Sequence, residues 1–458
     1  MAHQTVVLNI VGLDTGLLRD HAPRLRAIGE AGTTRGIDAA FPALTCSAQS
    51  DMLTGTTPEK HGIVGNGWYD RTSSEIRFWK QSNRLVQGDK IWDVARRREA
   101  GFTCSNMFWW YNMYSGADTA VTPRPMYLAD GRKQPDIWTN PPELRDRLQR
   151  ELGTFPLFHF WGPASDIRSS RWIADASRIV HETTRPDLQL IYLPHLDYAL
   201  QQLGPDDPAI AEHVRQIDEL AGDLVEHHRQ RGCRVLVVSE YGIGPVDDAV
   251  SINLALREAG LLAIRHERGT ELLDAGASAA FAVTDHQIAH VYLDPEVDRD
   301  RVRTLLEGLD GIDEVLGREE QMRRGVHHER CGDLLCISDP RRWFVWDYWT
   351  DDRKAPDYAR TVDIHRKPGY DPRELFLDPD LKAPRLRIAW KLLRKKLGFR
   401  TLMDVIPLDA SLVRGSHGRT DLGPDRSPVL LSSERMDELP DRLPASGVHD
   451  VMLRLLFD

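Results

Sequence analysis

Residues 41–70 read FPALTCSAQSDMLTGTTPEKHGIVGNGWYD, and their first half is a run of small polar side chains that adds little to a hydrophobic core. Thr45 and Cys46 stand side by side there, where a helix is expected to begin. A hydroxyl side chain at that position is a frequent helix N-cap. A nucleophile there is also helped by the positive end of the helix dipole and by free N–H groups, which hold the phosphate that it attacks. Thr45 is therefore a candidate nucleophile as well as a cap. Cys46 is the alternative nucleophile, because a deprotonated thiol is intrinsically more reactive.

Outward from this segment, short apolar runs alternate with helical patterns. Residues 5–13, 188–197 and 233–243 are expected to form buried strands, and the amphipathic stretch 208–230 a long helix. This alternation predicts a parallel sheet with helices on both faces. Ligands of such sheets bind beyond the carboxyl ends of the strands. The candidate site residues are the polar ones that follow the strands: Asp14, Asp197, Glu240 and Tyr241.

A different pattern begins after the middle of the chain. Strand-like IAHVYLD is followed by helical RDRVRTLLEGL and by two further short strand-like segments, GIDEVL and DLLCISD. We expect residues 276–344 to form a small inserted α+β cap. Residues 1–275 and 345–458 then form the core.

Composition limits the function classes. The 458 residues carry a formal net charge of −10, with 41% hydrophobic and 28% charged residues, which is typical of a globular protein and argues against a nucleic-acid binder. Five cysteines show no CxxC pair, which argues against a disulfide framework or a structural zinc knot. No signal-peptide pattern is seen at the N-terminus, and no apolar run approaches the roughly 20 residues of a membrane span. We expect a cytoplasmic protein.

Four motifs occur in order along nearly the whole chain: FPALTCSAQSDMLTGTTPEKHGIVGN, YLPHLDYALQQLGP, VLVVSEYGIGPV and RGSHGRT. Together they resemble the nucleophile segment and the later motifs of the alkaline phosphatase superfamily, in its nucleotide pyrophosphatase/phosphodiesterase branch. In the first motif, these residues stand in the places of the family pattern: Thr45, Gly55, Pro58, His61, Gly62, Ile63 and Asn66.

The resemblance implies an alkaline-phosphatase-like α/β fold and a threonine nucleophile that two metal ions activate. A threonine hydroxyl is a poor nucleophile at neutral pH unless a cation or base lowers its pKa. By the same resemblance, Thr45 attacks phosphorus, Asp197 and His417 are metal ligands, and Glu240 is a longer substitute carboxylate that completes the metal shell or acts as base.

The sequence departs from the family pattern at three ligand positions, which hold Val11, Gln201 and Tyr241. We therefore expect one tightly held divalent ion or none, whether zinc, manganese or magnesium, in place of a two-metal pair. His365 is a candidate substitute ligand, in a loop with nothing apolar to bury; a solvated surface histidine is the alternative. His195 and Asp14 are further candidate ligands. The alternatives are that His195 is an ordinary hydrogen-bonded histidine near a strand end and that Asp14 begins a turn.

Two further features bear on recognition. Asn66 and Lys80 are predicted to bind substrate, and aromatic residues near Lys80 would either stack on a ring or fill core. Residues 384–400 interleave seven cations with Leu, Ile and Trp. Such a segment fits peripheral contact with an anionic membrane surface. It fits equally a solvated basic face that steers an anionic substrate.

These observations predict a metal-assisted phosphodiester or pyrophosphate hydrolase, or a phosphoryl transferase, acting on a small phosphorylated molecule through Thr45. Two alternatives remain open. One is a catalytically degenerate scaffold or binding protein on the same fold, suggested by Val11, Gln201 and Tyr241. The other is a pathway enzyme that uses Thr45 as a transient phosphate carrier. The oligomeric state does not follow from the sequence.

Overall fold

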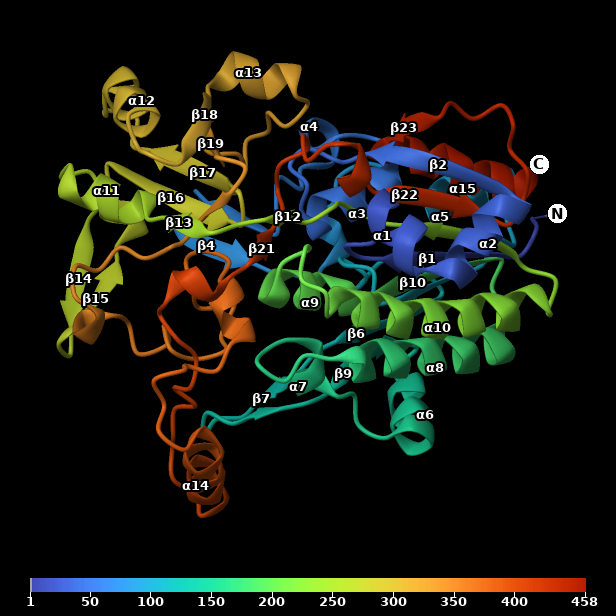
Figure 1. The fold of residues 1–458 in the computed structure, drawn as a ribbon, viewed down its shortest axis with the longest axis horizontal. Helices are drawn as coiled ribbons and strands as arrows, with labels where there is room; N and C mark the ends of the chain where they lie inside the picture. The colour runs from blue at the N-terminus through green and yellow to red at the C-terminus, as the bar shows by residue number, and fades with distance from the viewer. Residues whose placement is uncertain (1) are drawn as a thin grey trace.

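The computed structural model describes residues 2–458, and a nine-stranded sheet runs through the larger part of the molecule (Figure 1). Its strand order is β23-β2-β22-β11-β1-β10-β5-β6-β9. The bounds of these strands, taken in chain order, are β1 Thr5–Ile10, β2 Thr33–Asp38, β5 Cys104–Met107, β6 Thr119–Pro123, β9 Ile137–Asn140, β10 Leu188–Leu193, β11 Arg234–Val238, β22 Val429–Ser432 and β23 Arg442–Pro444.

The centre of the sheet is parallel and buried on both faces. β1 pairs in parallel with β10 on one side, from Thr5 opposite Leu188 to Ile10 opposite Leu193, and with β11 on the other. Every residue of β1 and β10 is buried. Near-continuous runs of β-branched and other apolar residues suit such doubly covered strands. The predicted strands at 5–13, 188–197 and 233–243 therefore contain the central strands of the sheet.

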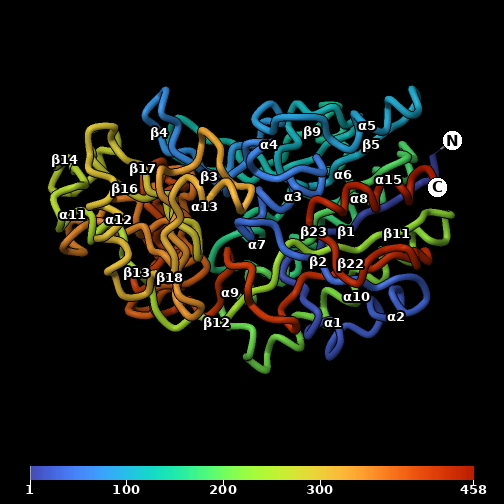
Figure 2. The backbone as a smooth tube through the Cα atoms, turned by 90° about the horizontal axis from the view of Figure 1, so that it is seen from above, coloured from blue at the N-terminus to red at the C-terminus, as the bar shows by residue number. Residues whose placement is uncertain are grey.

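Helices cover the two faces of this sheet. Figure 2 shows α5 (Ile91–Arg98) and α15 (Val448–Phe457) on one side, and α1 (Thr15–His21), α2 (Pro23–Ala31) and α10 (Ile210–Arg229) on the other. α10 is amphipathic, with a buried stripe at helical spacing formed by Val214, Ile217, Ala221 and Leu224. α8 (Ile167–Thr184) packs beside α10 and against β10. Among residues 2–458, no helix combines the length and apolar character needed to cross a bilayer.

A second, four-stranded antiparallel sheet lies within the predicted cap. Its order is β16 (Ala280–Asp285), β17 (Ile288–Leu293), β19 (Leu334–Ser338) and β18 (Ile312–Leu316), and α12 (Arg299–Glu307) packs against β18. The apolar cluster of this sheet also includes Ile252, Leu256 and Trp346, which lie outside residues 276–344. The boundaries at 276 and 344 therefore remain a prediction, since the packing extends past both.

The polar helix α3 (Thr45–Thr54) is buried along its whole length. Its hydroxyls bond to backbone carbonyls of the preceding turn: Ser50 Oγ donates to Cys46 O and Thr54 Oγ1 to Ser50 O, both at 2.7 Å. Buried polar groups are tolerated when they are hydrogen-bonded. This local satisfaction explains how a run of small polar residues forms a buried helix, which ends at Gly55 in the left-handed region, with φ 68°.

The loop around Tyr370 is held by buried ion pairs. Asp371 Oδ2 lies 2.9 Å from Lys367 Nζ, Asp371 Oδ1 lies 2.8 Å from Arg373 Nε, and all three side chains are fully buried. Burial raises the pKa of Asp371, but the two cations outweigh it and hold that pKa well below its usual range. The expectation that the loop around His365 has nothing apolar to bury is wrong for its second half, because Tyr370 and Leu375 are buried there beside these paired charges.

Replacement of Asp371 by alanine should destabilise the protein strongly. Asp371→Ala leaves Lys367 and Arg373 with fewer acceptors in the interior, and breaking a buried pair costs about 3–5 kcal/mol. Urea denaturation of the variant and the wild type measures the loss. Glu151→Ala, which removes the exposed partner of Arg147, is the matched control and should change little. Equal stabilities for the two variants would contradict the prediction.

Candidate active site

Four segments that are far apart in the sequence meet beyond the carboxyl ends of the central strands. α3 begins at Thr45, and α9 (His195–Leu203), which follows β10, carries Asp197 in its first turn. Tyr241 follows β11, and His417 follows β21 (Gly415–Ser416). These four residues line one small cavity of about 50 Å³. The four sequence motifs thus contribute to a single site, in which Asp197 and Tyr241 follow the strands β10 and β11, at the edge of the sheet where ligands of parallel sheets bind.

A chain of hydrogen bonds joins the Thr45 hydroxyl to a buried carboxylate. Thr45 Oγ1 lies 2.8 Å from Tyr241 Oη, and Tyr241 donates to Asp197 Oδ1 at 3.3 Å. With the tyrosine proton directed at Asp197, Thr45 donates its own proton to the tyrosine oxygen. Gln201 Nε2 donates to Asp197 Oδ2 at 2.8 Å. Burial raises the pKa of Asp197 to about 7, although Gln201 and Tyr241 each lower it.

Glu240 is held by two amide groups next to this chain. Its Oε1 accepts from Asn9 Nδ2 at 2.5 Å and from Gln49 Nε2 at 2.6 Å. Its Oε2 is buried and has no hydrogen-bond partner within residues 2–458. Burial raises the pKa of Glu240 to about 8, although the two amides lower it. One carboxylate oxygen is therefore fixed, and the other is free to accept a proton.

His417 is oriented by a backbone carbonyl. Its Nδ1 lies 2.7 Å from Ala43 O, and because a carbonyl only accepts, Nδ1 carries the proton and Nε2 keeps its lone pair. Nε2 lies 3.8 Å from Asp197 Oδ1. The ring stacks on Tyr241 with centroids 3.8 Å apart and planes 8° apart. Burial lowers the pKa of His417 to about 3, so the imidazole is neutral.

The donor set suits one divalent ion better than the pair that the family pattern implies. Asp197 Oδ1 and His417 Nε2 face each other, and Gln201 Oε1 is buried without a hydrogen-bond partner in the described chain. A histidine whose other nitrogen bonds a carbonyl is the usual form of a metal ligand. A second ion would find few ligands around Glu240, because amide hydrogens occupy Oε1, only Oε2 has no partner among residues 2–458, and the neighbouring family positions hold apolar Val11 and the hydroxyl of Tyr241.

The two predicted substrate-binding residues lie in different environments. Asn66 lines the cavity, and its Oδ1 accepts from the N–H of Cys46 at 3.0 Å. The backbone N–H and Nδ2 of Asn66 donate to the buried carboxylate of Asp285 at 2.9 and 3.1 Å. Lys80 is exposed, next to Trp79, which lines the cavity.

The candidate substitute ligands do not join the cluster. His365 is exposed, and its ring contacts that of Tyr127 at 6.4 Å, while the preceding Ile364 lines the cavity. Asp14 caps α1 by accepting from Leu17 N at 2.8 Å. His195 is buried, with Nε2 3.2 Å from His213 Nδ1. The loop turns His365 outward because its buried side belongs to the ion-paired residues that follow.

Several residues of the site were not predicted from the sequence. His286 lines the cavity, with its ring centroid 3.8 Å from that of His417 and 4.1 Å from that of Tyr370. Asp285 and His286 are adjacent titratable residues between two strand-like segments, a signal that was available in the sequence. Asn9 is the only polar residue inside VVLNIVGL, residues 6–13, and it faces Glu240.

Comparison with known proteins agrees with these motifs. The family model described as type I phosphodiesterase/nucleotide pyrophosphatase matches residues 5–371. An uncharacterized pyrophosphatase/phosphodiesterase of Schizosaccharomyces pombe is 24% identical over 53% of this chain and 45% of its own length. Human ectonucleotide pyrophosphatase/phosphodiesterase family member 7 is 23% identical over 59% of this chain and 54% of its own. The chain thus spans about half the length of these relatives.

Solved structures confirm the predicted fold class. Phosphonoacetate hydrolase from Sinorhizobium meliloti 1021, in complex with phosphonoacetate, superposes with a TM-score of 0.63 at 16% sequence identity. The match covers 99% of this chain and 96% of that one. The alkaline-phosphatase-like α/β fold expected from the four motifs is therefore the observed one.

Loss of the Asn66 side chain should have a pH-dependent cost. Burial raises the pKa of Asp285 to about 7, and the Asn66 donors lower it. Because this pKa lies above the unfolded value, Asp285 makes the fold less stable as pH rises towards 7. Asn66→Ala removes a donor to the charged form, so we expect a loss of about 1–3 kcal/mol that is larger near pH 8 than near pH 5.

Urea denaturation near both pH values measures this effect. Asn83→Ala is the matched control, because Asn83 is also buried but its Nδ2 donates to an uncharged group, Tyr111 O, at 2.7 Å. The control should lose the same free energy of unfolding at both pH values. An equally pH-independent loss for Asn66→Ala would show that Asp285 does not depend on that donor.

Proposed function

Because the chain belongs to the type I phosphodiesterase/nucleotide pyrophosphatase family, we propose that it cleaves phosphodiester or pyrophosphate bonds of a small phosphorylated molecule, with Thr45 as the nucleophile. The observation that supports this best is the position of the Thr45 hydroxyl. It lies at the first residue of α3, in a cavity, and is hydrogen-bonded to Tyr241. A helix N-terminus favours the anionic phosphoryl group that such a nucleophile attacks.

The proposed reaction has two halves. Thr45 Oγ attacks phosphorus, the bond to the leaving oxygen breaks, and Glu240 Oε2 takes the threonine proton. Water then attacks the phosphothreonine and restores the hydroxyl. Glu240 suits the role of base because burial raises its pKa to about 8, close to neutral pH. If a second hydroxyl compound replaces the water, the same site transfers the phosphoryl group.

Asp197 and His417 would hold one divalent cation, whether zinc, manganese or magnesium. When bound, that ion would neutralise charge on the phosphoryl oxygens and lower the pKa of the attacking hydroxyl. Tyr241 orients Thr45 through its hydroxyl. Asn66 keeps one Nδ2 hydrogen beyond the one given to Asp285, and we assign it to a phosphoryl oxygen. Lys80, at the surface beside Trp79, would attract the anion.

The surroundings of the site suit a substrate with a flat or apolar part. Aromatic side chains make up much of the cavity lining: Trp79, Trp110, Phe160, Trp161, Tyr192, Tyr198, Tyr241 and Tyr370. Aromatic rings offer stacking surfaces and exclude water from the reacting group. With a volume of about 50 Å³, the cavity has room for a phosphoryl group, and the rest of the substrate would lie towards its mouth.

Thr45→Ala should abolish hydrolysis of an activated phosphodiester such as a nitrophenyl ester, with kcat falling by at least about three orders of magnitude. Cys46→Ala should retain most of the activity. The thiol is fully buried, and burial, with Asp285 and Glu240 nearby, raises its pKa well above the ordinary value. Release of nitrophenolate with each divalent metal added in turn is the measurement.

Three outcomes would overturn the proposal in different ways. A wild-type protein that is inert towards phosphodiesters and monoesters with every common divalent metal would favour the scaffold alternative. A dead Cys46→Ala variant beside an active Thr45→Ala variant would leave the fold intact and transfer the role of nucleophile to the thiol. A wild type that accumulates phosphothreonine without hydrolysis would favour the phosphate-carrier alternative.

We also propose that α14 (Pro384–Lys396) contacts an anionic membrane surface. Figure 1 shows this helix projecting from the body of the molecule, and none of its residues is buried. A stripe of exposed apolar side chains runs along one face and past its end: Leu386, Trp390, Leu393 and Leu397. At 100° per residue, Arg387 and Arg394 flank this stripe on one side and Arg385 and Lys396 on the other. Cations beside a half-exposed apolar face suit acidic lipid headgroups.

Binding to vesicles tests this proposal. The protein should sediment with phosphatidylcholine vesicles that contain phosphatidylserine and bind much less to phosphatidylcholine alone, because each cation near the surface contributes about 1 kcal/mol. Leu393→Glu should abolish the binding. Phe158→Glu changes an exposed apolar residue of α7 (Leu157–Phe160), a helix separate from α14 (Figure 1), and should not. A Leu393→Glu variant that loses self-association instead, with no vesicle binding by the wild type, would assign the stripe to a second copy of the chain.

A further inference from the structure

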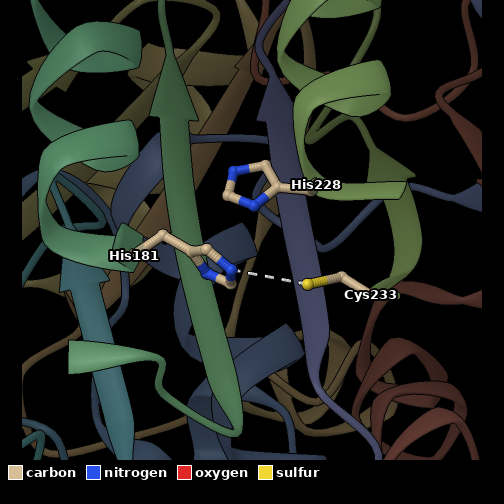
Figure 3. A group of neighbouring side chains, drawn as sticks. All are labelled: His181, His228 and Cys233. Atoms are coloured by element: carbon tan, nitrogen blue, oxygen red, sulfur yellow. Dashed lines mark hydrogen bonds between the residues drawn. The ribbon is translucent and has the colours of Figure 1, made fainter. Parts of the chain in front are cut away.

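Three buried side chains gather at the opposite end of the central strands from the candidate active site. His181 lies near the end of α8, His228 in the last turn of α10, and Cys233 directly before β11. Their exposed fractions are 2%, 0% and 6%. Figure 3 shows the two imidazole rings and the sulfur turned towards one another from three separate elements. None of the three has a part in the proposed reaction at Thr45.

The distances among these side chains match those of a metal centre. Cys233 Sγ lies 3.6 Å from His181 Nε2, and one ligand atom from each residue lies within 4.8 Å of the others. Zinc binds sulfur at about 2.3 Å and imidazole nitrogen at about 2.0–2.1 Å, with tetrahedral angles. From those lengths, the sulfur and nitrogen ligands of one zinc ion lie about 3.6 Å apart. The observed spacing therefore requires no rearrangement of this pair.

The hydrogen-bonding state of the two histidines also indicates a ligand. Both ring nitrogens of His228, which is fully buried, lack a hydrogen-bond partner in the described part of the chain, and so does His181 Nδ1. A buried polar group without a partner costs free energy, and native structures nearly always satisfy such groups. A hydrogen bond between Cys233 and His181 explains one contact but leaves His228 unsatisfied.

We propose that His181, His228 and Cys233 bind one zinc ion. Binding releases the thiol proton of Cys233 to solvent and leaves a thiolate ligand. His227, whose ring lies 5.1 Å from that of His228 and 6.5 Å from that of His181, is a candidate for the fourth position, and its Nε2 lies 3.7 Å from Glu182 Oε1. The ion would join α8, α10 and the start of β11, so it would serve stability.

The proposed site differs from the zinc knot that paired cysteines would form. Five cysteines without a CxxC pair argued against a structural zinc knot. The proposed site instead combines a single cysteine with two histidines. His228 and Cys233 are only five positions apart, whereas β10, α9 and most of α10 separate His181 from them in the chain. The third ligand is therefore recognised only from the packing of α8 beside α10.

Cobalt substitution separates this site from the active site. The full chain, stripped of metal with a chelator and titrated with Co²⁺, should develop a sulfur-to-cobalt charge-transfer band at one equivalent, because this is the only cluster of three possible metal ligands with a cysteine among residues 2–458. Cys233→Ser and His228→Gln should lose the band. Cys104→Ser removes another buried cysteine and should keep it, as should His417→Gln, which disrupts the other cation site.

Two further measurements complete the test. Zn²⁺ should displace the cobalt band and raise the thermal midpoint of the wild type in a concentration-dependent manner, and Cys233→Ser should lose most of that rise. Circular dichroism verifies that the variants fold. A wild type that develops no thiolate band, or a band that survives Cys233→Ser, would overturn the proposal, and the cluster would then be a packed Cys–His hydrogen bond. Neither result depends on phosphodiesterase activity.

Discussion

Parallel hydrogen bonding of β1 to β10 on one side and to β11 on the other determines where the polar chemistry of this protein lies. Strands that run in the same direction end at the same edge, so the segments that follow β10 and β11 emerge side by side. That edge receives Asp197 and Tyr241, with Thr45 brought to it by α3. The opposite edge collects the ends of α8 and α10, and with them His181 and His228. One pairing pattern therefore produces two separate clusters.

At the carboxyl edge of the sheet, the buried carboxylates are hydrogen-bonded to neutral amide and hydroxyl groups, whereas buried carboxylates are usually paired with cations. Asn9 and Gln49 donate to Glu240, and Gln201 and Tyr241 donate to Asp197. Neutral donors stabilise a carboxylate less than a cation does, which is why burial raises the pKa of both acids to near or above neutrality. The loop around Asp371 shows the contrast, because two full cations there hold the pKa low.

The sequence was informative where chemistry follows a strand directly. Asp197, Glu240 and Tyr241 come after long apolar runs, so their shared edge could be predicted from the order of elements. Gln49 and His286 could not be placed in this way, because their positions depend on the packing of α3 and of the second sheet. His365 shows a different limit. Its loop does approach the site, but through Ile364 and Tyr370, and no local pattern distinguishes the inward residues from the outward one.

The order of strands also bears on how the chain folds as it is synthesised. β22 lies between β11 and β2, with antiparallel bonds to each, and β23 lies on the far side of β2. β2 occupies residues 33–38, whereas β22 occupies residues 429–432. Until the ribosome has made that last segment, β2 has no partner strand and β11 has one unpaired edge. Unpaired edges attract other strands, so the nascent chain is exposed to wrong pairing for most of its synthesis.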